Sequence, residues 1–100
     1  MNAQLSGCSF KSADLPDGVF TEASFQDADF DGANLEVAKF DGVTQAAGLS
    51  FRNASLIEVD FTNANLEDVD FTGADITDAV FDGASLPETF DEMIIAKIDT

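Results

Sequence analysis

A strict five-residue period runs through the chain and limits its possible folds more than any other feature. In the second half, a large apolar residue returns at every fifth position: Phe51, Leu56, Phe61, Leu66, Phe71, Ile76, Phe81 and Leu86. From Leu56 onward, a small or slim side chain lies two positions before each, as Ala64 does before Leu66. An α-helix repeats every 3.6 residues and a flat strand every 2.0, so neither has this period. The sequence therefore predicts a structure whose local geometry repeats every five residues.

The same spacing begins near the N-terminus, where the large apolar residues are Leu5, Phe10, Leu15, Phe20, Phe25, Phe30, Leu35 and Phe40. The residue between the small and the large apolar side chain is polar in most repeats, which indicates local β alternation. The next two residues are rich in Asp, Gly, Ser, Thr and Asn, which favour turns. Each unit is thus predicted to be a very short strand followed by a corner, and repeated units coil the chain around an apolar core.

Residues twenty positions apart, which is four units, indicate how many units make one coil. Stacked coils place similar side chains above one another, so the spacing at which similar residues recur is the length of one coil. Two of the four columns contain only phenylalanine: Phe10, Phe30, Phe51 and Phe71 in one, and Phe20, Phe40, Phe61 and Phe81 in the other. A third is aliphatic, with Leu15, Leu35, Leu56 and Ile76. The fourth has Gln45 as its polar exception. We expect four units per coil, with the two phenylalanine columns facing each other.

One irregularity interrupts the period near residues 43–49. Phe40 and Phe51 are eleven residues apart instead of ten, so one residue has been added. The phenylalanine columns stay separate from the aliphatic column after this point, which predicts a retained unit with a one-residue bulge. We place the bulge at Gly48, because glycine in a strand often marks one.

The units resemble those of the pentapeptide-repeat family, in which a small residue, a polar residue and Leu or Phe recur together. Examples are Ala13-Asp14-Leu15, Ala28-Asp29-Phe30, Ala33-Asn34-Leu35, Ala64-Asn65-Leu66 and Ala74-Asp75-Ile76. The resemblance covers about residues 3–87 and implies an all-β fold, a right-handed quadrilateral β-helix with four units per coil. We therefore assign residues 1–87 to one β-helix domain, with its irregularity near 43–49.

Residues 88–100 depart from the repeat and are predicted to form a short C-terminal capping helix and tail. Pro87 ends the pattern, and residues 89–92 have the form of a capping box, with Thr89 as the N-cap and Glu92 three residues later. Phe90, Met93, Ile94 and Ile98 lie on one side at helical spacing. We expect this helix to cover the last coil, whereas no matching cover is expected over the first coil, where Leu5 lies.

The composition argues against several functions. The net charge is −16, with 4 basic and 20 acidic residues, which disfavours direct nucleic acid binding and anionic membranes. The chain has no histidine, no catalytic motif and no cofactor-binding motif. Asp27, Asp29 and Asp31 match the start of a calcium loop, but its twelfth position is Ala38 instead of glutamate. We therefore expect no enzyme activity, no metal and no cofactor, and a protein of the cytoplasm.

Carboxylates outside the aliphatic column form the candidate interaction face, whose members are Asp14, Asp17, Glu36, Glu58, Asp75 and Asp78. The first interpretation is a structural or protein-interaction module without an assignable specific activity, in which surface charge keeps the solenoid soluble. The alternative follows from the resemblance, since some pentapeptide-repeat proteins imitate duplex DNA and bind DNA gyrase or topoisomerase IV. With about four coils this chain has half of their length or less, and it lacks the projecting loop that some of them use.

The ends of the predicted rod suggest a second kind of contact. Leu5 at the first coil and Phe90, Met93, Ile94 and Ile98 in the tail are candidate residues for end-to-end contact. They predict either a homodimer or end-to-end association with another repeat protein, whereas the sequence does not identify any other protein partner.

Overall fold

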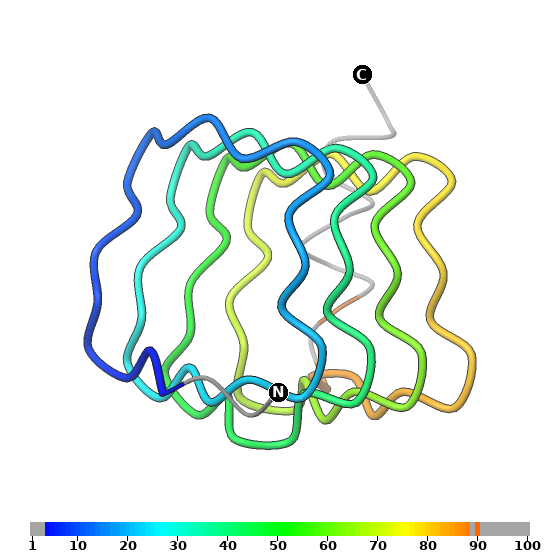
Figure 1. Ribbon diagram of the computed structural model, residues 1–100. Helices are drawn as coiled ribbons and strands as arrows, with labels where there is room; N and C mark the ends of the chain where they lie inside the picture. Colours follow the sequence, from blue (N-terminus) through cyan, green and yellow to red (C-terminus); the bar gives the residue numbers. More distant parts are fainter. Residues whose placement is uncertain (1–3, 89, 91–100) are drawn as a thin grey trace.

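The computed structural model describes residues 4–88 and Phe90, and these residues wind into four stacked coils (Figure 1). Coil 1 comprises residues 4–23, coil 2 residues 24–44, coil 3 residues 45–64 and coil 4 residues 65–84. Neighbouring coils are joined by parallel bridges between residues 20 or 21 positions apart, such as Ser9↔Asp29 and Asp29↔Ser50. Each described strand is a single bridged residue, so the sheets run along the rod.

The bridged residues form four faces, which we name A to D in chain order. Face A contains Gln4, Ser24, Gln45, Asn65 and Ser85; face B contains Ser9, Asp29, Ser50 and Asp70; face C contains Asp14, Asn34, Ser55 and Asp75; and face D contains Val19, Lys39, Asp60 and Val80. The corners between them are named AB, BC, CD and DA. Four faces per coil confirm the four units that the spacing of twenty predicted.

Each corner is a β-turn that starts at the large apolar residue. Ala13 N–H donates to the Phe10 carbonyl at 3.0 Å, and the same bond recurs in the later units. The second turn residue has a positive φ in every described corner except that at residues 67–68. A positive φ at this position alone is the signature of a type II turn, which favours glycine, asparagine or aspartate there.

The interior consists of the predicted columns. Phe61 stacks on Phe81 in its own column, with ring centroids 5.3 Å apart, and meets Phe51 of the opposite column edge-on at 5.8 Å. Phe25, Phe30, Phe40, Phe51, Phe61 and Phe71 are fully buried, as are Leu35, Leu56 and Leu66. The two phenylalanine columns therefore face each other as expected, with the edge-to-face geometry that aromatic rings prefer.

The added residue lies at Thr44, so the placement at Gly48 is wrong. Val43 and Ala46 both point inward, and Thr44 and exposed Gln45 lie between them where other units have one residue. Gly48 is an ordinary second turn residue with φ +79°. Its glycine reflects the corner geometry, which the sequence interpretation mistook for a bulge.

The bulge also corrects the fourth column, in which Ala46, not Gln45, is the inward residue. Leu49 then occupies the inward position that a small residue fills in the other units, and it is fully buried. Its large side chain fills the volume that the small side chain of Ala46 leaves in the core. Asn65 N–H reaches back to the Val43 carbonyl at 2.8 Å, and face A has no bridge between Gln45 and Asn65. The segment projects below the coil in Figure 1, beside a polar hollow of about 80 Å³.

The two ends of the described rod differ. Phe90 lies edge-on to Phe71 and Phe81, with centroid distances of 5.3 and 5.4 Å, so it covers part of the last coil. The predicted helix and its residues Met93, Ile94 and Ile98 fall outside the described residues. At the other end, Leu5, Phe10, Leu15 and Phe20 are only partly buried against the core.

Candidate functional site

Many acidic side chains on the faces have a structural role. The coil-to-coil ladder does not use the backbone N–H of the first turn residue, and at several corners an Asp or Asn two positions earlier accepts it. Asp60 Oδ1 accepts from Thr62 N–H at 2.9 Å and from the Thr62 hydroxyl at 2.5 Å. Asp70–Thr72 and Asp75–Thr77 repeat this arrangement. These carboxylates therefore hold corners in place, as Asx turns do.

Two of these carboxyls have a perturbed pKa. Hydrogen bonds from the Thr62 hydroxyl and then the Thr62 amide lower the pKa of Asp60; partial burial opposes them and Lys39 adds to them. Partial burial raises the pKa of Asp70, but hydrogen bonds from Thr72 and the charge of Arg52 outweigh it, so the pKa is lowered overall. The Arg52 Nε and Asp70 Oδ2 atoms are 3.8 Å apart on the surface, a geometry that contributes little to stability.

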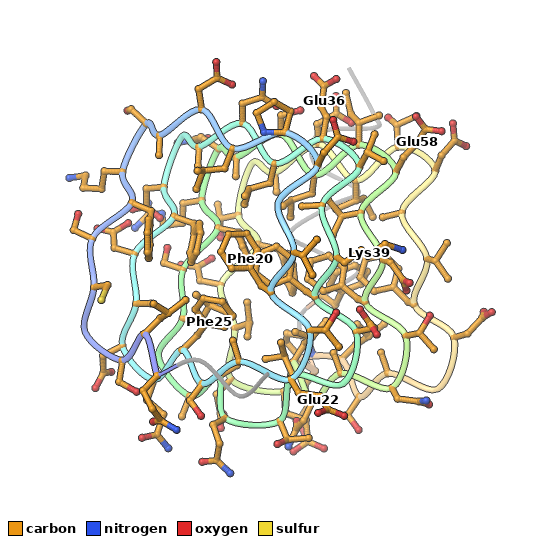
Figure 2. All side chains as sticks on the ribbon, viewed as in Figure 1. Phe20, Glu22, Phe25, Glu36, Lys39 and Glu58 are labelled. Carbon is orange, nitrogen blue, oxygen red and sulfur yellow. The ribbon has the colours of Figure 1, made fainter. Side chains whose placement is uncertain are left out.

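The predicted acidic face divides between two places in the fold. Asp14 and Asp75 lie on face C, where Asp14 Oδ1 accepts from Asn34 Nδ2 at 3.1 Å and Asp75 holds Thr77. The other four carboxylates lie at corner CD, the upper right edge of the molecule in Figure 2, where Glu36 and Glu58 project outward. Asp17, Glu36, Glu58 and Asp78 are all exposed, and their carboxylates have no hydrogen bond or ion pair within the described part of the chain.

Three of the four corners alternate glycine with a side chain at the second turn position. Corner BC has Ser12, Gly32, Asn53 and Gly73; corner DA has Glu22, Gly42, Asn63 and Gly83; and corner AB has Gly7, Asp27, Gly48 and Asp68. The side chains lie over the glycines of the next coil. A Cβ atom at Gly83 would come within 2.3 Å of Asn63 Oδ1, and one at Gly48 within 2.2 Å of Asp27 Oδ1. The alternation thus relieves both steric crowding and backbone strain.

Corner CD has no glycine at this position. Asp17, Val37, Glu58 and Asp78 adopt φ values of 62°, 65°, 59° and 59°. A left-handed conformation costs an L-residue about 1–2 kcal/mol, and a β-branched residue such as Val37 is a genuine outlier there. Sequence reasoning did not notice this difference, although counting glycines at a spacing of twenty would have revealed it.

Exposed valines lie beside the same corner. Val37 is 48% exposed at corner CD, and Val19 and Val80 are 69% and 39% exposed on the adjoining face D. Lys39 and Asp60 separate Val19 from Val80 along that face. We name the four carboxylates of corner CD together with these three valines the CD strip. Sequence reasoning also missed the valines, because it followed only the inward residues and the charges.

A hollow at the start of the tail lies away from the CD strip. It has a volume of about 760 Å³ and is bordered by Glu67, Asp68, Val69, Asp70, Leu86, Pro87 and Glu88. No group of three or more Cys, Asp or Glu side chains among residues 4–88 and 90 is arranged to hold a metal ion. The part of the chain that the structure describes also contains no helix with the length and apolar character of a membrane span.

Comparison with known proteins gives one family. Residues 2–42 and 47–89 match the sequence model of the family described as pentapeptide repeats (8 copies), and the gap between them contains the bulge. No protein of curated function matches the chain.

Three solved structures give the following comparisons. HetL, a pentapeptide repeat protein involved in heterocyst differentiation regulation in the cyanobacterium Nostoc, is 21% identical, with a TM-score of 0.51 over 88% of this chain and 49% of HetL. Trypsin-treated QnrB1, a plasmid-mediated fluoroquinolone resistance protein, is 18% identical, with a TM-score of 0.46 over 83% of this chain and 60% of QnrB1. A thylakoid lumen protein of Arabidopsis thaliana is 29% identical, with a TM-score of 0.32 over 81% and 60% of the two chains.

These comparisons bear on the fold alone. The chain spans about half of HetL, and HetL supports the expected right-handed quadrilateral β-helix.

Proposed function

Because the chain belongs to the pentapeptide-repeat family, we propose that it is a non-enzymatic protein-interaction module of the cytoplasm, with the CD strip as its contact surface. The observation that carries this proposal is the corner without glycine. The other three corners alternate glycine with side chains, whereas corner CD keeps a side chain in a strained conformation in every coil. Strain of this kind is concentrated at functional sites.

The chemistry of the CD strip defines the partner. Four free carboxylates favour a basic surface, and they steer its approach over a distance set by the ionic strength. The valines between and beside them offer apolar contacts that a purely electrostatic surface would lack. A folded protein surface with Lys or Arg side chains around an apolar centre has the chemistry to bind this strip.

Neutralising the CD strip tests this function. The variant Asp17→Asn, Glu36→Gln, Glu58→Gln and Asp78→Asn removes its four charges, and the control Glu22→Gln, Asp27→Asn, Glu67→Gln and Asp82→Asn removes four charges at the other corners. Quantitative affinity capture from the source cells should lose its specific partner with the first variant and keep it with the control. Equal loss with both variants would show that net charge alone governs binding.

A second candidate function is an acidic mimic of DNA that binds DNA gyrase or topoisomerase IV. The observation that favours it is the line of one corner carboxylate per coil, at a coil spacing of about 4.8 Å along a narrow rod. Inhibition of gyrase supercoiling by the parent protein, weakened by salt and by the CD variant but not by the control, is the expected result. The absence of inhibition at micromolar protein would leave the interaction module as the function.

A further inference from the structure

The hydrogen bonding between coils 3 and 4 is interrupted on face A. At the other junctions of this face, the N–H of the inward residue donates to the C=O of the bridged residue in the next coil, as in Phe25 to Gln45 at 2.7 Å and Leu66 to Ser85 at 2.7 Å. The equivalent groups between coils 3 and 4 are the Ala46 N–H and the Asn65 C=O. Neither has a hydrogen-bond partner among residues 4–88 and 90.

The bulge explains this interruption. Elsewhere on the rod, a bridged residue bonds to two residues of the preceding coil that are two positions apart. The added Thr44 places Val43 and Ala46 three positions apart. Because the Asn65 N–H already donates to the Val43 carbonyl at 2.8 Å, the Asn65 C=O does not also reach the Ala46 N–H.

The corner after the bulge has a looser coil-to-coil contact. The Gly48 nitrogen and the Asp68 carbonyl oxygen are 3.4 Å apart, whereas the Gly7 nitrogen lies 2.8 Å from the Gln26 carbonyl oxygen at the same corner of coils 1 and 2. A polar hollow of about 80 Å³ lies between coils 3 and 4 here, and Ala46, Asn65 and Asp68 are on its border.

The groups around the hollow restrict what it can bind. Ala46 is 4% exposed, and buried backbone N–H and C=O groups are almost always paired, either with protein or with ordered water. A cation would meet the Ala46 N–H, and an anion would meet the Asn65 C=O. An anion would also be repelled by Asp68, whose carboxylate has no hydrogen bond or ion pair within the described part of the chain. A neutral molecule that both accepts and donates hydrogen bonds suits these groups.

From these observations we propose that the bulge hollow is a binding site for an ordered water molecule, which accepts from the Ala46 N–H and donates to the Asn65 C=O. The hollow is large enough, since a water molecule occupies about 30 Å³ in the liquid, and Asp68 offers an acceptor for the second hydrogen. A bridge of this kind is nearly as favourable in enthalpy as a direct hydrogen bond. The site lies across the rod from corner CD, so it is independent of the proposed contact surface.

Nuclear Overhauser measurements between amide and water protons test the proposal on the full chain. The Ala46 amide should show a contact with a water that stays bound longer than the protein takes to tumble, and the rotating-frame experiment separates this contact from chemical exchange. The control is the Ala54 amide, whose buried N–H donates to the Phe51 carbonyl at 3.0 Å and should show no water contact. An Ala46 amide without a water contact would overturn the proposal.

Thr44→Ala and the deletion of Thr44 form a matched pair of variants. Thr44→Ala keeps the added residue, so the water contact of Ala46 should persist; its loss would assign the signal to the Thr44 hydroxyl and overturn the proposal. The deletion places Val43 and Ala46 two positions apart. The Ala46 N–H should then bond the Asn65 C=O directly, lose its water contact and exchange with solvent roughly tenfold more slowly.

A water contact that survives the deletion of Thr44 would contradict the bridge, because the hollow would then not depend on the bulge. A urea unfolding curve checks that both variants are folded. If the deletion prevents folding, the measurements on the parent protein and on Thr44→Ala still decide between a bound water and none.

Discussion

Corners CD and DA flank the same face and have the same turn geometry, yet they contain different residues at the strained position. Corner DA alternates Glu22, Gly42, Asn63 and Gly83, whereas corner CD contains Asp17, Val37, Glu58 and Asp78. The backbone favours glycine equally at both corners. We therefore attribute the side chains of corner CD to a requirement outside the coil, and the comparison separates residues that the fold needs from residues that a partner would need.

The largest expected effect comes from the interior that both corners share. Phe61→Ala opens a hole in the face D column, where the Phe61 ring contacts Phe40, Phe51, Phe71 and Phe81. The free energy of unfolding should fall by about 3–5 kcal/mol. Urea denaturation measures it, and a variant that melts within a degree of the parent would contradict the column assignment.

Introducing the CD pattern into corner DA should have the next largest effect. Gly42→Val places a β-branched side chain at φ +73°, with its Cβ 3.0 Å from Glu22 Cγ. The strain should destabilise the protein by about 1–2 kcal/mol. Gly42→Asn is the matched control and should cost less, because asparagine tolerates this conformation. Equal costs for the two variants would refute the role of backbone strain.

The smallest expected effect concerns the hydrogen bonds at the start of corner DA. Thr62→Val removes the hydroxyl donor to Asp60, so the pKa of Asp60 should rise toward its ordinary value in an NMR titration. The lowered pKa stabilises the fold above the unfolded value of about 3.9, and this contribution is lost as pH falls through the folded pKa. The variant should therefore lose less stability on acidification. Thr44→Val, at the exposed bulge, should leave the pKa of Asp60 unchanged.

Much of the fold could be predicted from the sequence, because the five-residue period and the columns at a spacing of twenty are properties of the interior that repeat in every coil. The position of the added residue could not. Val43, Ala46, Ala47 and Leu49 are all apolar, so different choices among them could point inward and fill the core equally well. The coil-to-coil hydrogen bonds decide which of them do.

The candidate site was predictable only in part. The carboxylates of corner CD follow from the column assignment, and the structure places four of the six predicted residues together there. Asp75 accepts a hydrogen bond from a turn N–H, and Val37 has a strained backbone with a positive φ. Counting charges in the sequence reveals neither property.

The free energy of unfolding of Val37→Gly, measured in urea against the parent protein, tests the central claim most directly. If the Val37 side chain is strained and serves no purpose in the fold, glycine should stabilise the protein by about 0.5–1 kcal/mol, after the entropic cost of glycine in the unfolded chain is subtracted. A variant less stable than the parent would show that Val37 serves the fold itself, and would contradict the assignment of corner CD to a partner.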